Sequence, residues 1–334
     1  MKKFVTAIIL VCMMLSMAAC GGSSEAEYKL GMGVVVSTDS SSDNNAQVDA
    51  TVATVVTDAN GKIVLCRLDC AQNKMDVTGG AVDTAKTFLT KRELGDDYNM
   101  VKYSDATLEW YQQAENFEAY CVGKTADEIA GIETKVNEEG YNVAVDETLY
   151  ASCSISIEDF IGAVVKACSD EKGQTFKASG ELKLGGAVND LAFLESTPAT
   201  DTDPAAVKMY TDFGATVVGA DGKILAAITD SIQPVVTADK EGKIVDSTFK
   251  GTKRELGSDY GMVAYGNAIA EWDAQAQAFA NYTVGKTADE VRAIETTQND
   301  DGYSVTADET LYASCTMQIT GMMAVLAQAA DYAR

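Results

Sequence analysis

The side chains most suited to binding or reacting with a ligand lie in one segment that occurs twice. Asp146–Cys153 is repeated without change as Asp308–Cys315, and a hydroxyl residue, Ser154 or Thr316, follows each copy. Carboxylates and hydroxyls can bind a polar ligand, and a segment that leads into a helix can present backbone N–H groups to an anion. The candidate ligand contacts in the two copies are Asp146, Tyr150, Ser152 and Ser154, and Asp308, Tyr312, Ser314 and Thr316.

The same repetition also has a purely structural explanation. Thr148–Ile155 fits a late β-strand, on which Leu149, Ala151 and Cys153 would alternate toward the core. The identity between the copies would then result from the same core packing in both, and not from ligand binding.

The absence of histidine excludes several kinds of catalytic site. A Ser-His-Asp triad, a Cys-His pair and a zinc or haem site with a histidine ligand cannot form. Asp58-Ala59-Asn60-Gly61 begins like a calcium loop, but the spacing fails at Lys62. We therefore expect a protein that is not an enzyme, and the hydrolase class has no legible support.

The N-terminal residues have the pattern of an exported bacterial lipoprotein. Two lysines precede an uncharged apolar run over residues 4–17, which is short for a bilayer span but suits the core of a signal peptide. The small residues before Cys20 and the Gly/Ser stretch after it resemble the lipobox. This resemblance implies a signal peptide over 1–19, lipidation of Cys20 and a flexible tether over 20–27. An ordinary secretory signal is the alternative.

The net charge and the predicted cellular location together limit the possible partners. The chain carries a formal net charge of -24, and removal of residues 1–19 takes away two lysines and no acid. Nucleic acid is therefore not an expected partner, because phosphate binding depends on lysine and arginine. We expect a lipid-anchored protein on the extracytoplasmic face of the bacterial cell membrane, with a small ligand or a cell-surface component as partner.

An internal duplication organises the chain. Residues 90–153 align without a gap with residues 252–315, and 40 of these 64 positions are identical. Each repeating unit is near 150 residues, which suits a domain and is too long for a solenoid repeat. The sequence predicts two tandem domains, over 28–170 and 176–334, that join near 169–175 and fold independently.

Each unit begins with predicted strands and continues with predicted helices. Asn60-Gly61 and Asp221-Gly222 lie between β-rich runs and predict hairpins, and second strand–turn–strand units are predicted at Gly79-Gly80 and Glu241-Gly242. Helices are predicted around 108–118, after the capping-box residues Thr125 and Thr287, and over the apolar positions Ile157, Phe160, Ile161, Val164, Val165 and Cys168. A β-meander, helices, a late strand and a C-terminal helix give each unit an α+β fold.

The repeated segment resembles the attachment region of the bacterial FMN-binding domain family. That family's motif is Asp-x-x-Ser/Thr-Gly-Ala-Thr/Ser-x-Ser/Thr, in which the last hydroxyl takes FMN through a phosphoester bond. Asp146, Ala151, Ser152 and Ser154 match this spacing, as do Asp308, Ala313, Ser314 and Thr316. The resemblance implies a shared fold and FMN as a possible cofactor at Ser154 and Thr316. It also implies electron transfer outside the membrane, as in exported members.

This chain departs from the motif at one pair of positions. Leu149-Tyr150 and Leu311-Tyr312 replace the family's Ser/Thr-Gly pair, whose glycine allows a tight turn or a close backbone approach. A tyrosine there would either fill the space that a flavin needs or stack on the flavin ring. We therefore expect a non-enzymatic lipoprotein with two FMN-binding-like domains that binds a ligand or a surface, with a flavin-carrying electron-transfer protein as the alternative.

Two further features leave alternatives open. The repeated basic pairs Lys91-Arg92 and Lys253-Arg254 could hold an anionic ligand or pair with nearby acids such as Glu93 and Asp97. After loss of Cys12 and lipidation of Cys20, six cysteines remain, and four of them have no counterpart in the other copy: Cys66, Cys70, Cys121 and Cys168. Cys66 and Cys70 share one strand face and could form disulfides with Cys121 or Cys168, or all four could be buried thiols.

Overall fold

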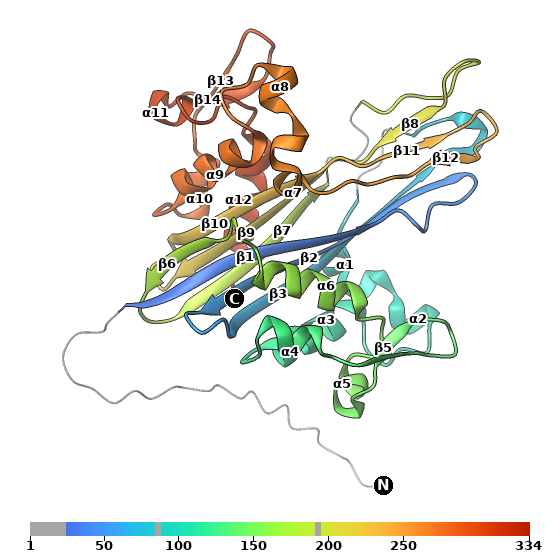
Figure 1. The fold of residues 1–334 in the computed structure, drawn as a ribbon, viewed down its shortest axis with the longest axis horizontal. Helices are drawn as coiled ribbons and strands as arrows, with labels where there is room; N and C mark the ends of the chain where they lie inside the picture. The colour runs from blue at the N-terminus through green and yellow to red at the C-terminus, as the bar shows by residue number, and fades with distance from the viewer. Residues whose placement is uncertain (1–24, 84–87, 191–194) are drawn as a thin grey trace.

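Two antiparallel β-sheets form the centre of the fold, which the computed structural model describes over residues 25–83, 88–190 and 195–334 (Figure 1). The first sheet contains, in order across the sheet, β3 (Ile63–Asp76), β2 (Asn45–Asp58), β1 (Ala26–Ser37) and β6 (Gln174–Ala178). The second contains β10 (Ile224–Ile232), β9 (Thr211–Gly219) and β7 (Leu182–Asp190). We call residues 28–170 the first half and 176–334 the second half.

The hairpins predicted at the Asx-Gly turns are confirmed. β2 and β3 pair around Asn60-Gly61, and β9 and β10 pair around Asp221-Gly222. Gly61 and Gly222 have φ values of 74° and 78°, in the left-handed region that glycine enters without steric cost. Asp58 Oδ1 also accepts hydrogen bonds from the backbone N–H groups of Asn60 and Lys62, so it closes the first turn.

A proline divides the long hairpin of the second half. Beyond Pro234 the chain continues as β11 (Val235–Ala238), which pairs with β8 (Ala205–Lys208) and β12 (Ile244–Asp246). Proline has no N–H group to donate, so the long ladder that β2 and β3 form in the first half is divided into two here. The turn predicted at Glu241-Gly242 is confirmed between β11 and β12.

The matching prediction at Gly79-Gly80 is wrong. These glycines lie in a 3₁₀ turn, Thr78–Gly80, directly after β3, and the described residues 81–83 and 88–90 form no strand. The first of the two adopts a φ of 63° inside this turn. The predicted turn is therefore present, but the strand predicted after it is absent from the described residues.

The same order of helices and short strands follows in each half. The first half has α1 (Lys91–Leu94), α2 (Met100–Tyr103), α3 (Trp110–Cys121), α4 (Ala126–Ala130), β4 (Thr134–Val136), β5 (Asn142–Ala144), α5 (Glu147–Ser152) and α6 (Glu158–Cys168). The second has α7 (Lys253–Leu256), α8 (Met262–Gly266), α9 (Trp272–Thr283), α10 (Ala288–Arg292), β13 (Thr296–Gln298), β14 (Ser304–Thr306), α11 (Glu309–Tyr312) and α12 (Thr320–Asp331). The predicted α+β class is confirmed, and so are the capping boxes that begin at Thr125 and Thr287.

The predicted late strand Thr148–Ile155 is wrong, because residues 148–152 lie in α5 and residues 153–155 form no strand. Asp146 caps this helix by accepting a hydrogen bond from the backbone N–H of Leu149 at 2.8 Å. Leu149 and Cys153 are both buried, and their separation of four residues matches a helical turn as well as a strand face. The apolar pattern is therefore correctly interpreted as core packing but wrongly assigned to a strand.

The fold has four layers, with helices on the outer face of each sheet (Figure 1). In the central layers the inner faces of both sheets share one hydrophobic core, which contains Leu30 and Val52 of the first half and Phe213 and Ile228 of the second. The outer face of the first sheet packs against α3 and α6, and that of β10 packs against α9 and α12. The strands are therefore buried on both faces, and the two halves share their central core.

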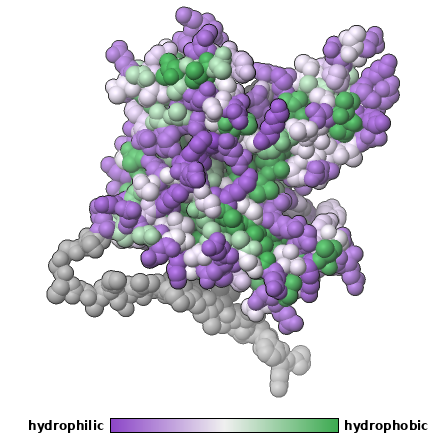
Figure 2. Space-filling view, viewed as in Figure 1, coloured by the Kyte–Doolittle hydropathy of each residue, from purple (hydrophilic) through white to green (hydrophobic). Residues whose placement is uncertain are grey.

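No helix in the described residues is both long and apolar enough to cross a bilayer. Figure 2 shows hydrophilic residues over most of the visible face, with hydrophobic residues gathered in smaller patches.

Candidate functional site

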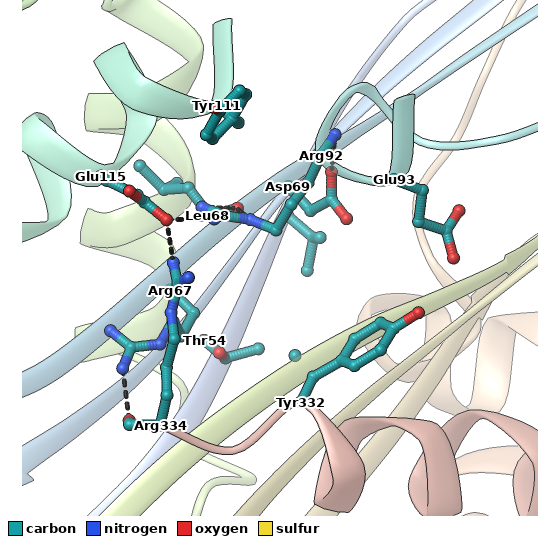
Figure 3. Close-up of a pocket in the computed structure, with 12 residues that line it drawn as sticks. Thr54, Arg67, Leu68, Asp69, Arg92, Glu93, Tyr111, Glu115, Tyr332 and Arg334 are labelled. Carbon is teal, nitrogen blue, oxygen red and sulfur yellow. Dashed lines mark hydrogen bonds and ion pairs between the residues drawn. The ribbon is translucent and has the colours of Figure 1, made fainter. Parts of the chain in front are cut away.

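A cleft of about 370 Å³ opens where the first half meets the end of the second (Figure 3). Its floor comes from β2, β3 and β7, where Thr54, Leu68 and Gly186 lie. Tyr111 of α3 and Tyr332, which follows α12, lie on opposite sides (Figure 3). We call this site the inter-half cleft, because neither half forms it alone.

Three guanidinium groups and two carboxylates form a network along one wall of the cleft. Arg92 lies 3.1 Å from Glu115 and 2.5 Å from Glu118, and Arg334 lies 2.5 Å from Glu115. Arg67 approaches Glu118 at 3.6 Å and donates a hydrogen bond to the carbonyl of Arg334. The network gathers three guanidinium groups in a chain whose formal net charge is -24.

Two buried polar atoms of the cleft have no hydrogen-bond partner in the described residues. They are the hydroxyl oxygen of Thr54 and the Nε atom of Arg67. Thr54 is 1% exposed, and an unpaired buried polar atom destabilises a fold unless something else satisfies it. Both residues line the cleft, so a ligand with an acceptor group would lie beside them.

The opposite junction between the halves explains why space remains at this one. Arg254, the counterpart of Arg92, forms a buried ion pair with Asp170 at 3.0 Å. In the alignment of the halves, Tyr332 takes the place of Asp170 beside Arg92. Because a tyrosine cannot neutralise a guanidinium, Arg92 pairs with Glu115 and Glu118 instead, and the space between Tyr111 and Tyr332 stays open.

Asp69 lies at the floor of the cleft and has a counterpart at Asp230. Burial raises the pKa of each carboxyl to about 6, although Arg92 or Arg254 and backbone hydrogen bonds oppose the shift. Each carboxylate accepts a hydrogen bond from the backbone N–H of that arginine, at 3.2 and 3.1 Å. These contacts fix the first turns of α1 and α7 against β3 and β10.

We expect the double variant Asp69→Asn, Asp230→Asn to gain stability relative to the parent chain as the pH rises. Each carboxyl titrates near 3.8 when unfolded and near 6 when folded, so the native state binds more protons between these values. The stability of the parent chain therefore falls as the pH rises between these two pKa values. The asparagine side chains of the variant do not titrate, so the variant avoids this loss. The difference in free energy of unfolding should grow by up to about 3 kcal/mol per site between about pH 4 and pH 7. Urea titrations at both values measure it, and a constant difference would contradict the prediction.

The predicted contacts of the first half lie on and around α5, away from the inter-half cleft. Asp146 caps the helix, and Tyr150 is 39% exposed on its surface. The Ser152 hydroxyl donates to the carbonyl of Leu149 at 3.0 Å. Ser154 bonds to the buried Gln113, with its N–H at 2.8 Å and its hydroxyl at 3.3 Å from Oε1.

The second half has the same main contacts around α11. Asp308 caps α11 and accepts a hydrogen bond from the Tyr282 hydroxyl at 3.1 Å. Backbone hydrogen bonding, chiefly from the N–H of Leu311, lowers the pKa of Asp308. Ser314 donates to the carbonyl of Leu311, Tyr312 is 41% exposed, and Thr316 bonds to Gln275 at 2.9 and 3.3 Å.

The two arginines of the basic pairs form ion pairs, but with acids other than those named from the sequence. Arg92 and Arg254 pair with Glu115, Glu118 and Asp170, and Glu93 instead closes the capping box of α1. Lys91 and Lys253 each lie over a tyrosine ring and a tryptophan ring. Glu115, Glu118, Thr54 and Tyr332 carry no sequence signal, because only tertiary contact makes them neighbours of Arg92.

The six cysteines of the described residues carry free thiols. Cys66 and Cys121 lie close enough for a hydrogen bond between their thiols, and this bond and burial raise the pKa of Cys66. No group of three or more metal-binding side chains occurs in the part of the chain that the structure describes. The predicted lipidation site, Cys20, lies outside the described residues.

Comparisons with known proteins add no relative. No protein-family model matches this chain, and no curated protein or solved structure matches it.

Proposed function

We propose that this protein is a membrane-anchored extracytoplasmic lipoprotein that binds a small anionic ligand in the inter-half cleft and is not an enzyme. The observation that carries the proposal is the pair of unsatisfied donors in the cleft, the Thr54 hydroxyl and Arg67 Nε. Both groups can donate a hydrogen bond to an acceptor, and guanidinium groups bind carboxylates and phosphates especially well.

The shape and charge of the cleft narrow the ligand class further. Val52, Leu68 and the rings of Tyr111 and Tyr332 offer apolar walls. The polar lining consists of three arginines and three acids: Arg67, Arg92, Arg334, Asp69, Glu93 and Glu115. A ligand with a short apolar body and one carboxylate or phosphate group satisfies both sides. Sites of this kind combine a mostly apolar lining with a few well-placed polar groups.

Glu115 supplies a way for the ligand to enter the network. Its side chain is 38% exposed and bridges Arg92 and Arg334, whereas that of Glu118 is only 5% exposed. An incoming carboxylate can displace Glu115 toward solvent and take over its two guanidinium contacts. Glu118 stays in place and keeps the buried part of the network neutralised.

We expect butyrate to bind the cleft and Thr54→Val to weaken this binding by about 5- to 10-fold, the value of one lost hydrogen bond. Valine keeps the shape of threonine and removes an unpaired hydroxyl, so the fold should be as stable as before or slightly more stable. Arg334→Gln should weaken binding as well, because Arg334 is half exposed and its loss leaves little uncompensated charge in the core. Calorimetric titration of the full chain measures both effects.

The second half offers a matched control for this experiment. Thr216 also has a buried hydroxyl without a partner in the described residues, but it does not line the cleft. Thr216→Val should leave butyrate affinity unchanged. Equal losses in both variants, or tighter binding of butylamine than of butyrate, would contradict the proposed site.

The anchor and the flavin alternative have their own tests. Incorporation of labelled palmitate that disappears in Cys20→Ser supports the anchor, and retention of the label rejects it.

The alternative function, extracytoplasmic electron transfer by FMN bound at Ser154 and Thr316, rests on the resemblance of the repeated segment. Both hydroxyls are half-buried beside Gln113 or Gln275. A visible absorption spectrum after co-expression with a flavin transferase, with the masses of the two peptides, decides this alternative.

A further inference from the structure

A second cavity, of about 290 Å³, lies in the second half at the start of α12. The residues that line it include the aromatic residues Tyr210, Tyr260 and Trp272, together with Met322, Lys253 and Asp212. We call it the α12 cavity. It shares no lining residue with the inter-half cleft, so the two sites can be tested separately.

The first half fills the corresponding place with its own aromatic ring. Phe160, the counterpart of Met322, packs edge to face on Trp110, with 5.6 Å between the ring centroids. In the second half the narrower Met322 and the adjacent Gly321 replace Phe160 and Asp159. The aromatic wall formed by Trp272 is therefore retained, and the ring that would cover it is missing.

The charge around the lysine also differs between the halves. Two carboxylates, Asp49 and Asp159, act electrostatically on Lys91 of the first half. The strand registers place Tyr210 at the position of Asp49, because Asp212 pairs with Ser231 as Thr51 pairs with Cys70. Asp159 is replaced by Gly321, so the second half loses both acids and gains only Asp212.

Lys253 is consequently a cation with an incomplete set of partners. Its ammonium group lies 5.2 Å from the ring centroid of Tyr260 and 5.4 Å from that of Trp272. Within the described residues it forms no ion pair at 4.0 Å or less, although Asp212 interacts with it at longer range. An anionic group that enters the cavity would therefore find a donor that no carboxylate already occupies.

We propose that the α12 cavity binds a small aromatic carboxylate, whose ring takes the place that Phe160 has in the first half and whose carboxylate faces Lys253. Stacked and edge-to-face contacts with Trp272 and the tyrosines hold the ring. The volume lies near the lower end of the range for ligand sites, about 300 Å³, and suits a single substituted ring. The site belongs to the second half alone.

Benzoate is the probe for this proposal, and the two tryptophans of the chain provide the signal. In a Trp110→Phe background, benzoate should change the fluorescence of Trp272 in a saturable way. Calorimetry on the chain with both tryptophans present checks the same affinity without that substitution. Absence of saturable benzoate binding in both measurements would overturn the proposal.

The first half supplies the matched variants. Gly321→Asp with Met322→Phe gives the second half the side chains of the first and should weaken benzoate binding at least about 10-fold, a loss of about 1.4 kcal/mol. Asp159→Gly with Phe160→Met should create a second benzoate site that reports through Trp110. Unchanged affinity in a filled variant that still unfolds cooperatively would overturn the proposal.

The role of Lys253 is tested by the charge of the probe. Benzoate should bind more tightly than benzyl alcohol, and benzylamine should bind most weakly. Lys253→Met should remove this preference while retaining binding of the ring, whereas Lys91→Met should have no effect. If the variant with Gly321→Asp and Met322→Phe fails to fold, the comparison of Lys253→Met with Lys91→Met tests the proposal by itself. A preference order that Lys253→Met leaves intact would overturn the assignment. Thr54→Val should leave benzoate binding unchanged, so failure at the inter-half cleft remains distinguishable.

Discussion

Substitution of Gly31 or Gly185 by alanine is expected to destabilise the fold by more than about 3 kcal/mol, because neither position has room for a Cβ atom. At Gly31 a Cβ would overlap the carbonyl oxygen of Ala167 in α6. At Gly185 it would overlap the carbonyl oxygen of Ala329 in α12. Both obstacles are helix backbone, which cannot move aside as a flexible side chain could.

A third glycine provides the control for this pair. A Cβ added at Gly266 meets no atom within 4 Å, and Gly266 ends α8 without positive φ. Gly266→Ala should therefore be neutral or slightly stabilising, since alanine favours a helix. Chemical denaturation of the three variants measures the free energies of unfolding. A loss at Gly31 or Gly185 no larger than that at Gly266 would refute the close helix–strand contact.

Neither half is expected to unfold cooperatively when it is expressed alone, although the duplication by itself predicts two independent domains. The inner faces of the two sheets bury each other, and a separated half would expose Leu30 and Val52, or Phe213 and Ile228, to water. Large exposed apolar faces of this kind promote association or collapse. β6 strengthens the dependence, because it lies at the join and pairs with β1.

The experiment compares fragments 25–170 and 176–334 with their mixture. Each fragment alone should bind a hydrophobic dye and lack a sharp thermal transition. Co-expression of the two fragments should abolish the dye binding and restore the sharp transition, as in the full chain. Arg254→Gln should weaken reassembly, because it leaves Asp170 of the other fragment buried without its partner. Two cooperative transitions, one in each isolated fragment, would show that the halves are independent domains.

The halves also show how a duplicated fold can acquire different sites. At one junction Asp170 fills the space beside Arg254, and at the other Tyr332 leaves the inter-half cleft beside Arg92. The exchange of Asp170 for Tyr332 thus distinguishes a junction closed by a buried ion pair from a junction with an open cleft. The internal counterpart in each case supplies the matched control.

Local sequence signals were sufficient for most secondary structure. Asn60-Gly61 and Asp221-Gly222 specify hairpins because glycine reaches positive φ without a steric penalty. The capping boxes at Thr125 and Thr287 specify helix starts because their side chains satisfy backbone N–H groups within three residues. All these interactions join residues near in sequence, so the sequence alone contains them.

Tertiary structure decided what local signals leave ambiguous or do not contain. The burial of Leu149 and Cys153 suits a strand or a helix, and in the folded chain α5 packs both residues into one core with Phe117. The inter-half cleft joins Thr54 with Tyr332, which are distant in sequence and meet only because the two sheets pack face to face. Such contacts depend on the burial of whole sheet faces, a collective effect to which each residue adds little, and no short sequence pattern records it.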